Sequence, residues 1–288
     1  MRGLGRPSPL GRTIPSWGPN RGIQIVYSAA TDPRVLEFAM KIRLSICLAA
    51  LAIAAASPAS SDELKIFGSR VTKMVVDDIG PQFEKATGHH LIMVADVAAV
   101  MKRRIEAGEP FDVAVLVSFQ ADDLIKKGKL LADSRADLMK AGIGVTVRRG
   151  APLPDISTVD AFKKTLLAAK SIVYLKEGAS SIHLDRVFAN MGIAQALAAK
   201  TIRPETEAVS EKVADGEVEL GMIVIPNILS VPGAQLVGPI PEDIQSYIVF
   251  TGAVGANSQH QQAARDLIAF LKSPAAASSI KSKGMNPG

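Results

Sequence analysis

From residue 64 onward, short runs of β-branched and apolar residues alternate with segments in which apolar residues recur at helical spacing. The expected elements are strands over 64–67, 91–94 and 111–117, separated by helices over 74–86 and 97–107. Strands that alternate with helices in this way predict a mostly parallel sheet with helices on both faces. The third strand is apolar at nearly every position, which is typical of a strand buried on both faces.

A change in this pattern after the third strand indicates a second lobe. A glycine-flanked strand over 142–147 can carry the chain into that lobe, and a segment rich in proline and glycine over 235–241 can return it. The other expected elements are helices over 121–127, 157–169, 180–191, 206–214, 259–272 and 274–283, and strands over 172–175, 220–225 and 245–254. We therefore expect an α/β protein with lobe 1 formed by 62–141 and 246–288, lobe 2 by 142–245, and a hinge near 142–144 and 241–245.

Residues 40–61 have the layout of a secretory signal peptide. Two basic residues, Lys41 and Arg43, precede an apolar stretch over 44–56, which is shorter than the roughly 20 residues of a transmembrane helix. Small residues allow cleavage after Ala56, Ala59 or Ser61. The mature chain is therefore expected in the periplasm.

The formal net charge of +5 is carried by the first 61 residues. Residues 62–288 contain 26 basic and 26 acidic side chains, so we expect no nucleic-acid partner. The only cysteine, Cys47, lies in the expected signal peptide, which leaves the mature chain without a disulfide, a catalytic thiol or a Cys-ligated metal. Residues 1–39 have two interpretations, either sequence upstream of a true start at Met40 or a disordered extension.

Two α/β lobes joined by two crossings enclose a cleft, and ligands of such sheets bind beyond the carboxyl ends of the strands. The loops there lead into helix N-termini, whose unpaired N–H groups and partial positive charge attract anions. Four loops of this kind are expected, over 68–70, 95–98, 178–181 and 226–227. The sequence thus predicts a small anionic solute as the ligand.

Seven segments carry a resemblance to a known family, in the same order along the chain. They are LKIFGSRVT, PQFEKATGHHLIMV, RIEAGEPFDVAVL, SSIHLDRVFANMGI, VADGEVELGMIV, VGPIPEDIQ and AARDLIAFLKSPAAASSIKSKGM. Together, 62–288 resembles the molybdate-binding periplasmic proteins of ABC transporters. The resemblance implies a type II periplasmic binding fold, capture of an oxyanion such as molybdate or tungstate by hinge closure, docking on an ABC permease in the inner membrane, and a monomer.

The family holds its oxyanion with hydroxyl side chains and backbone N–H groups, and the resemblance assigns these contacts to positions in this chain. The serine of the first loop falls at Ser69 or Arg70, depending on where a one-residue insertion is placed, and the serine of the second falls at Ala98. Backbone ligands fall at Ser180 and Thr206, and the binding tyrosine falls at Val224. With their neighbours, the expected ligand-binding residues are Ser69, Arg70, Val97, Ala98, Ser118, Ser180, Ser181, Thr206, Val224 and Asn227.

Two of these positions depart from the family pattern. Ala98 and Val224 have no hydrogen-bond donor in their side chains, and each donor missing from a desolvated oxyanion costs roughly 1–3 kcal/mol. The chain therefore looks like a divergent member of the family. A small organic carboxylate is the second candidate ligand, because the forked guanidinium of Arg70 suits a planar anion.

Several of these residues also have ordinary structural interpretations. Arg70 is either a ligand clamp or a solvated surface residue. Asp96 either caps the following helix or pairs with Arg70. Ser180 and Ser118 can each cap a helix as well as touch the cleft. His183 has no companions for a metal site, and we expect no metal and no cofactor.

The usual motifs of catalysis are missing from the sequence. It contains no G-x-S-x-G elbow, P-loop, H-E-x-x-H or dinucleotide-binding glycine fingerprint. No histidine is obviously placed as the base that a serine nucleophile needs. We therefore expect binding without chemistry; the alternatives are an exported enzyme on the same fold and a ligand sensor that acts on another protein.

Overall fold

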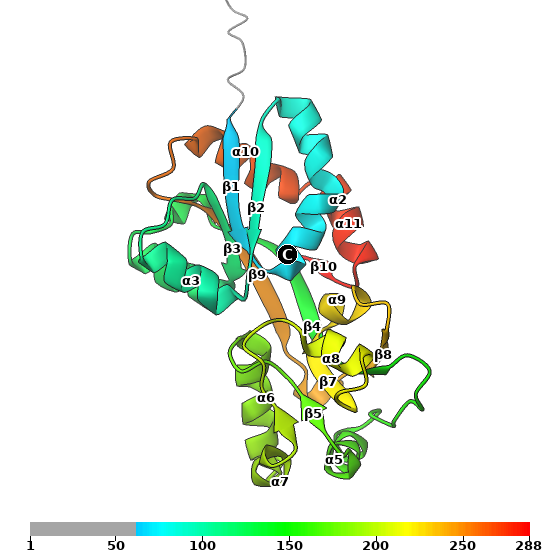
Figure 1. Ribbon diagram of the computed structural model, residues 1–288. Helices are drawn as coiled ribbons and strands as arrows, with labels where there is room; N and C mark the ends of the chain where they lie inside the picture. Colours follow the sequence, from blue (N-terminus) through cyan, green and yellow to red (C-terminus); the bar gives the residue numbers. More distant parts are fainter. Residues whose placement is uncertain (1–61) are drawn as a thin grey trace, which may run out of the picture. The chain divides into compact units, whose positions relative to one another are not determined.

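The computed structural model describes residues 62–288, and three parallel strands form one edge of its sheet (Figure 1). Strand β1 (Glu63–Gly68) lies between β2 (His90–Ala95) and β3 (Val113–Val117). The helices that follow these strands are α2 (Arg70–Thr87), α3 (Ala98–Glu106) and α4 (Ser118–Lys126). The expected β-α-β-α-β order is confirmed, and every residue of β3 is buried, as its apolar sequence predicts.

Helix α2 shows how the sequence positions the end of β1 against a helix start. Its apolar residues recur at helical spacing and are buried: Val71, Val75, Ile79 and Phe83. Gly88 ends the helix with a φ of 79°, and its N–H donates to the carbonyl oxygen of Glu84. This left-handed conformation favours glycine. The first residue of the helix, Arg70, is therefore held at the carboxyl end of β1.

Two long antiparallel strands link these parallel strands to the rest of the sheet. Strand β9 (Tyr247–Val254) pairs with β3, and β4 (Ala136–Arg148) pairs with β9 along 136–142. From Ile143 onward, β4 pairs instead with β7 (Leu220–Val224) and β8 (Ala234–Pro239). The change of partner falls within the region where the sequence predicts a hinge, and the hinge itself remains a prediction.

Strand β7 continues the sheet into a second set of parallel strands. It pairs with β5 (Ile172–Val173), which pairs with β6 (Thr201–Ile202). The helices of this part are α5 (Val159–Ala168), α6 (Ala179–Asn190), α7 (Ala194–Ala198), α8 (Val209–Ala214) and α9 (Ile225–Leu229). The chain then contributes α10 (Gln261–Leu271), α11 (Pro274–Ser282) and β10 (Asn286–Pro287), which pairs with β4. Short 3-10 turns, η1 (Ala132–Ser134) and η2 (Glu242–Ile244), precede β4 and β9.

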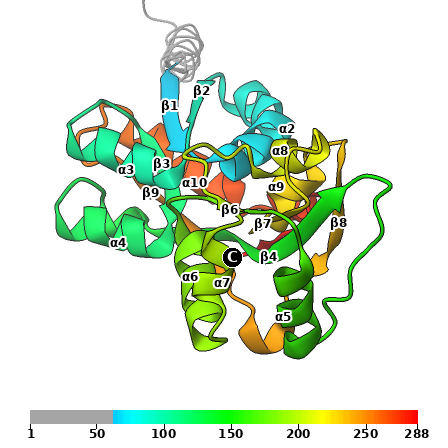
Figure 2. The same cartoon turned by 60° about the horizontal axis from the view of Figure 1, so that its bottom comes forward.

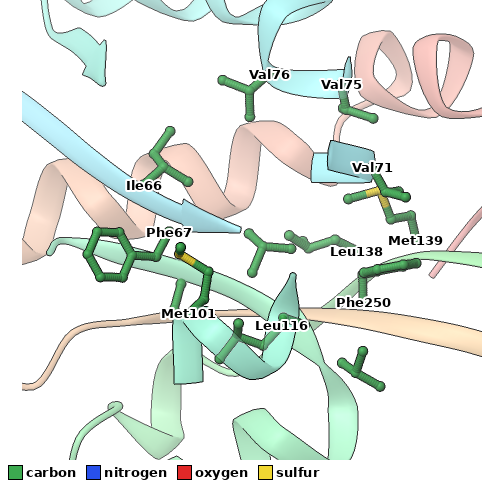
Figure 3. Close-up of a cluster of buried hydrophobic side chains, with 14 of the residues drawn as sticks. Ile66, Phe67, Val71, Val75, Val76, Met101, Leu116, Leu138, Met139 and Phe250 are labelled. Atoms are coloured by element: carbon green, nitrogen blue, oxygen red, sulfur yellow. The ribbon is translucent and has the colours of Figure 1, made fainter. Parts of the chain in front are cut away.

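Buried apolar side chains form two clusters. The larger one, part of which is drawn in Figure 3, contains residues of β1, β3 and β9, including Phe67, Leu116 and Phe250. It extends to residues of α8 and α9. The smaller cluster lies among β4, α5, α6 and β7. Strand β4 contributes to both, through Met139 and Val145, so this strand connects the two cores.

Several local expectations differ from the structure, among them the start of α2, which lies at Arg70 rather than 74. Pro226, expected to begin a turn, lies in the first turn of α9, where a missing N–H has no intrahelical partner to lose. Segment 235–241 contributes to strand β8, which the sequence pattern did not reveal. Helix α8 begins at Val209 rather than 206, so Thr206 lies in the loop that precedes it.

The expected signal peptide, Cys47 and segment 1–39 lie outside the described residues. Across 62–288, none of the helices combines the length and the apolar character that a membrane span requires.

Candidate functional site

The carboxyl ends of β1, β3 and β7 and the helix starts beside them enclose a small cavity, here called the central cavity. Five of the expected ligand-binding residues line it: Ser69, Val97, Ala98, Ser180 and Val224. Its volume is about 40 Å³, far below the roughly 300 Å³ of an ordinary ligand pocket. A ligand larger than a few atoms therefore requires the walls to move apart.

Two larger cavities flank the central cavity. The Arg70 cavity, of about 250 Å³, is lined by Arg70, Lys73, Ala95, Asp96, Val97 and Glu207. The Arg186 cavity, of about 310 Å³, includes Ser118, Phe119, Ile182, His183, Arg186 and Tyr247 in its lining. Val97 and Glu207 also line the central cavity, as do Val117, Ala179 and Ile248 of the Arg186 cavity. The central cavity therefore adjoins both of the others, and the three adjoining cavities are here called the row of cavities.

Three expected ligand-binding residues are not in these linings. Ser181 is buried, and its hydroxyl donates to the carbonyl of Gly178 at 2.9 Å. Thr206 is exposed in the loop before α8. Asn227 is 1% exposed and lies in the first turns of α9.

Four helices begin at these cavities without a side-chain cap. The residues at their N-cap positions are Ser69 for α2, Val97 for α3, Val117 for α4 and Gly178 for α6. The chain does use such caps elsewhere, since Thr158 caps α5 and Ser273 caps α11. Uncapped N–H groups with a partial positive charge attract anions, so the row of cavities favours a negatively charged ligand.

The structure contradicts three of the cap assignments that the sequence suggested. Asp96 precedes the N-cap position of α3, and its Oδ1 accepts from the N–H of Val97 at 2.7 Å. Ser118 is the first residue of α4, and its hydroxyl contacts β9. Ser180 lies within α6, whose N-cap is Gly178 with a φ of 144°, a conformation that favours glycine.

Arg70 reaches from α2 to the loop before α8 and to α8 itself. Its backbone N–H donates to Oε2 of Glu207 at 3.2 Å, and its Nε lies 3.8 Å from the same oxygen. Its Nη1 forms an ion pair with Oε1 of Glu211. Its acidic partners are therefore these two glutamates rather than Asp96. A carboxylate of the protein itself thus lies on the anion-attracting start of α2.

Glu207 has an unusual environment for a carboxyl group, because its side chain is only 13% exposed. Burial raises the pKa of Glu207 from 4.5 to about 7, since the charged form loses its hydration. Arg70 and the amide of Asn227 lower this pKa, whereas the negative charge of Asp96 raises it further. A carboxyl with a pKa near 7 can both accept and return a proton at neutral pH.

Several buried polar atoms around Arg70 and Glu207 have no hydrogen-bond partner among residues 62–288. They include Oγ of Ser69, Oδ1 of Asn227 and Oε2 of Glu211. Unpartnered buried polar atoms are uncommon and need an explanation. Ser69 is 3% exposed and lines the central cavity, so its hydroxyl is available to donate to a ligand oxygen.

Sequence reasoning missed Glu207 and Glu211. A signal was present, because Glu207 follows Thr206 directly and Glu211 lies four residues further on, within the helix that the sequence predicts over 206–214. Nothing in the sequence, however, indicated that Arg70 would lie against them. Figure 2 shows α2 and α8 near one another, and the ion pair of Arg70 with Glu211 joins them.

The resulting donor set suits an organic anion. Arg70, the uncapped helix starts and the hydroxyl of Ser69 can hold a carboxylate, and Glu207 can exchange a proton with whatever is held. In the part of the chain that the structure describes, no group of three or more His, Cys, Asp or Glu side chains is arranged to bind a metal ion. His183 contacts the carbonyl oxygen of Ile244 through Nε2 at 2.7 Å.

Comparison with known proteins agrees with the fold and with the resemblance described above. Residues 64–286 match the family model of bacterial extracellular solute-binding proteins. An aconitate isomerase of Pseudomonas sp is 36% identical over 249 residues, 84% of this chain and 94% of that protein. The molybdate-binding protein ModA of Azotobacter vinelandii is 27% identical over 256 residues, 84% of this chain and 96% of that protein.

Among solved structures, the periplasmic molybdate-binding protein of Azotobacter vinelandii superposes with a TM-score of 0.67 at 18% identity, covering 77% of this chain and 98% of that one. The predicted α/β fold class and the family resemblance are thereby confirmed. The family consists mostly of binding proteins without enzymatic activity, and it implies a small solute as ligand, an ABC-transporter permease as partner and a periplasmic location. The chain belongs to the family of bacterial extracellular solute-binding proteins, as a divergent relative of its molybdate-binding members.

Proposed function

We propose that this protein binds a small organic polycarboxylate of the aconitate type in its row of cavities and moves a proton on it, so that it interconverts double-bond isomers. The observation that carries the proposal is Glu207, a nearly buried carboxyl with a pKa of about 7 that accepts the first N–H of α2 and lies beside the guanidinium of Arg70. The relative named aconitate isomerase, which aligns over most of both chains, supports the choice of substrate.

The site suits a carboxylate better than a tetrahedral oxyanion. Ala98 and Val224 line the central cavity and offer no side-chain donor where the resemblance predicts a serine and a tyrosine. Arg70 instead supplies a planar fork of donors that matches the two oxygens of a carboxylate. The carboxylate of Glu207, which now lies on the N–H of Arg70, shows that this position accepts such a group.

The proposed reaction needs no cofactor and no change in oxidation state. Ionised Glu207 takes a proton from the methylene carbon next to a carboxylate, and the electron pair spreads over the adjacent double bond and its carboxylates. Arg70, Ser69 and the helix N–H groups stabilise this negative charge. The protonated Glu207 then returns the proton to the other end of the three-carbon unit, so the double bond moves by one position and its geometry can change.

Capture without chemistry is the second candidate function, and membership of a family composed mostly of binding proteins favours it. In that case the two lobes close on an anion in the periplasm, and the closed monomer delivers it to a permease in the inner membrane. Molybdate and tungstate are the first oxyanions to consider under this alternative. A sensor that closes on its ligand and signals to another protein would use the same site.

One experiment separates these functions. The exported protein, purified from the periplasm and refolded to remove any carried ligand, is incubated in D2O with cis-aconitate or trans-aconitate and followed by proton NMR. We expect each isomer to be converted into the other with uptake of deuterium. Glu207→Gln should slow this conversion by about 100-fold or more, while both proteins are still stabilised thermally by the acid.

Thermal stabilisation by a panel of anions, measured beside the conversion of aconitate, shows which outcomes contradict the proposal. Thermal stabilisation by aconitate without conversion supports capture alone. Stabilisation by molybdate or tungstate and not by any organic acid contradicts the proposal and supports oxyanion uptake. The control variant is Glu205→Gln, which removes an exposed carboxyl two residues away, and it should convert aconitate at the wild-type rate.

A further inference from the structure

The central cavity adjoins a second, larger cavity whose lining contains neither Arg70 nor Glu207. Helices α4 and α6 lie next to one another in Figure 2, and side chains of both line the Arg186 cavity. This cavity shares Val117, Ala179 and Ile248 with the central cavity. A ligand held by Arg70 can therefore extend into it when the central walls part.

Arg186 is the one arginine in the lining of this outer cavity, and its side chain is exposed. Most arginines within 62–288 are engaged; Arg203, for example, pairs with Asp185 at 3.0 Å and Arg265 with Asp133 at 3.0 Å. Arg186 has no hydrogen bond or ion pair with any residue in that range. Its guanidinium is thus available to an anion.

The charges at the two ends of the row differ. The lining of the Arg70 cavity includes Asp96 and Glu207, whereas the lining of the Arg186 cavity contains no acidic side chain among the described residues. Its walls include apolar side chains that are about half exposed, Phe119, Ile182 and Tyr247. A positive charge above an apolar wall suits a carboxylate at the end of a short carbon chain.

We propose that Arg186 is a specificity-determining residue that holds the distal carboxylate of a polycarboxylate whose other end lies at Arg70 and Ser69. This inference rests on the proposed function and adds the reason why an acid with several carboxylates is preferred over one with a single carboxylate. The site then selects for the distance between negative charges on the ligand, since the two arginines line different cavities that both adjoin the central cavity.

Arg148 provides a matched control for Arg186. It is also exposed, and it has no ion pair or hydrogen bond through its guanidinium with the described residues. It is the last residue of β4 and lines none of the three cavities. Substituting either arginine by alanine removes the same charge. Any difference in ligand affinity between the two variants therefore reflects where the arginine lies in the structure.

The test is calorimetric titration of the exported protein and both variants with trans-aconitate, fumarate and crotonate, which carry three, two and one carboxylates. Arg186→Ala should weaken the binding of trans-aconitate by about tenfold or more, as expected for a lost charged hydrogen bond, and change the binding of crotonate by less than about twofold. Arg148→Ala should leave all three affinities within about twofold. Arg186→Lys should restore part of the loss.

Two results would overturn the inference while leaving the proposed function intact. Either Arg186→Ala binds trans-aconitate as the wild type does, or it weakens all three acids equally. Failure of the wild-type protein to bind any of the acids would instead contradict the proposed function itself. Because Arg186 is exposed, its variants are expected to unfold at the wild-type temperature, which is measured in parallel.

Discussion

The backbone N–H of Arg70 donates a hydrogen bond to Oε2 of Glu207 at 3.2 Å, across a separation of 137 residues in the chain. The contact joins the start of α2, which follows β1, to the loop before α8. A carboxylate bound at this helix start must therefore displace Glu207 or share the position with its protonated form. The pH dependence of stability and of binding follows from this relationship.

Glu207→Gln is expected to stabilise the protein at pH 8 and to change its stability little at pH 5. The pKa of Glu207 is raised from 4.5 to about 7 in the folded protein, so the folded state binds more protons than the unfolded state between these values. The wild type accordingly loses stability as the pH rises through this window. Gln does not ionise, so its gain in the free energy of unfolding should grow between pH 5 and pH 8, up to at most about 3 kcal/mol, and the gain in Tm should grow with it.

Glu205→Gln is the control for this prediction. Glu205 is exposed, and its hydrogen bond with Lys176 lowers its pKa, which is the opposite direction. Its substitution should therefore not produce a gain that grows with pH. A Tm difference for Glu207→Gln that is constant from pH 5 to pH 8 would contradict the assignment of a raised pKa.

Binding of trans-aconitate at pH 7.5 is expected to take up a fraction of a proton. A bound carboxylate brings negative charge next to Glu207, which raises the pKa of Glu207 further and favours its protonated form. The uptake is measured by titration calorimetry in buffers that differ in ionisation enthalpy. Glu207→Gln should abolish the dependence on buffer, and an unchanged dependence would show that another group takes up the proton.

The pattern of the sequence was sufficient for the elements that surround the site. The spacing of Val75, Ile79 and Phe83 and the stop at Gly88 predict the body of α2, although the helix begins at Arg70, four residues before the predicted start. The apolar run of β3 identifies a buried strand. These are local signals, because each depends on residues within a few turns of one another. The loops expected at the cleft accordingly bring Ser69, Ala98 and Ser180 into one cavity.

The chemistry of the site depends on contacts that local patterns do not contain. Glu207 obtains its raised pKa from burial, which outweighs the opposing effect of Arg70, a residue 137 positions away in the sequence. The family resemblance assigned a ligand contact to Thr206 instead, which is the residue before Glu207 and is exposed. Pro226 in α9 is a similar case, because a proline fits the first turn of a helix as well as it fits a turn.

Gln245→Ala is expected to destabilise the protein by about 2 kcal/mol or more, because its side chain makes four hydrogen bonds, two of them with Ile143. The N–H of Ile143 donates to Oε1 of Gln245 at 2.9 Å, and Nε2 of Gln245 donates to the carbonyl of Ile143 at 3.0 Å. The side-chain amide thus satisfies the backbone N–H and carbonyl of Ile143, at the point where the pairing of β4 with β9 ends. Urea unfolding measures the effect. The control is Gln259→Ala, whose single bond to the carbonyl of Asn257 is exposed, with an expected change within about 0.5 kcal/mol.

Ala98→Ser is expected to raise the affinity for molybdate by about five- to tenfold, because it adds a hydroxyl donor to the central cavity at a position 9% exposed. The affinity for trans-aconitate should change by less than about twofold, since Arg70 and Glu207 are untouched. Titration with each anion measures both effects, with Ala168→Ser on the exposed face of α5 as the control. An equal gain for both anions would mean that the hydroxyl acts on any negative charge, and the loss of a serine at this position would then not explain a preference for carboxylates.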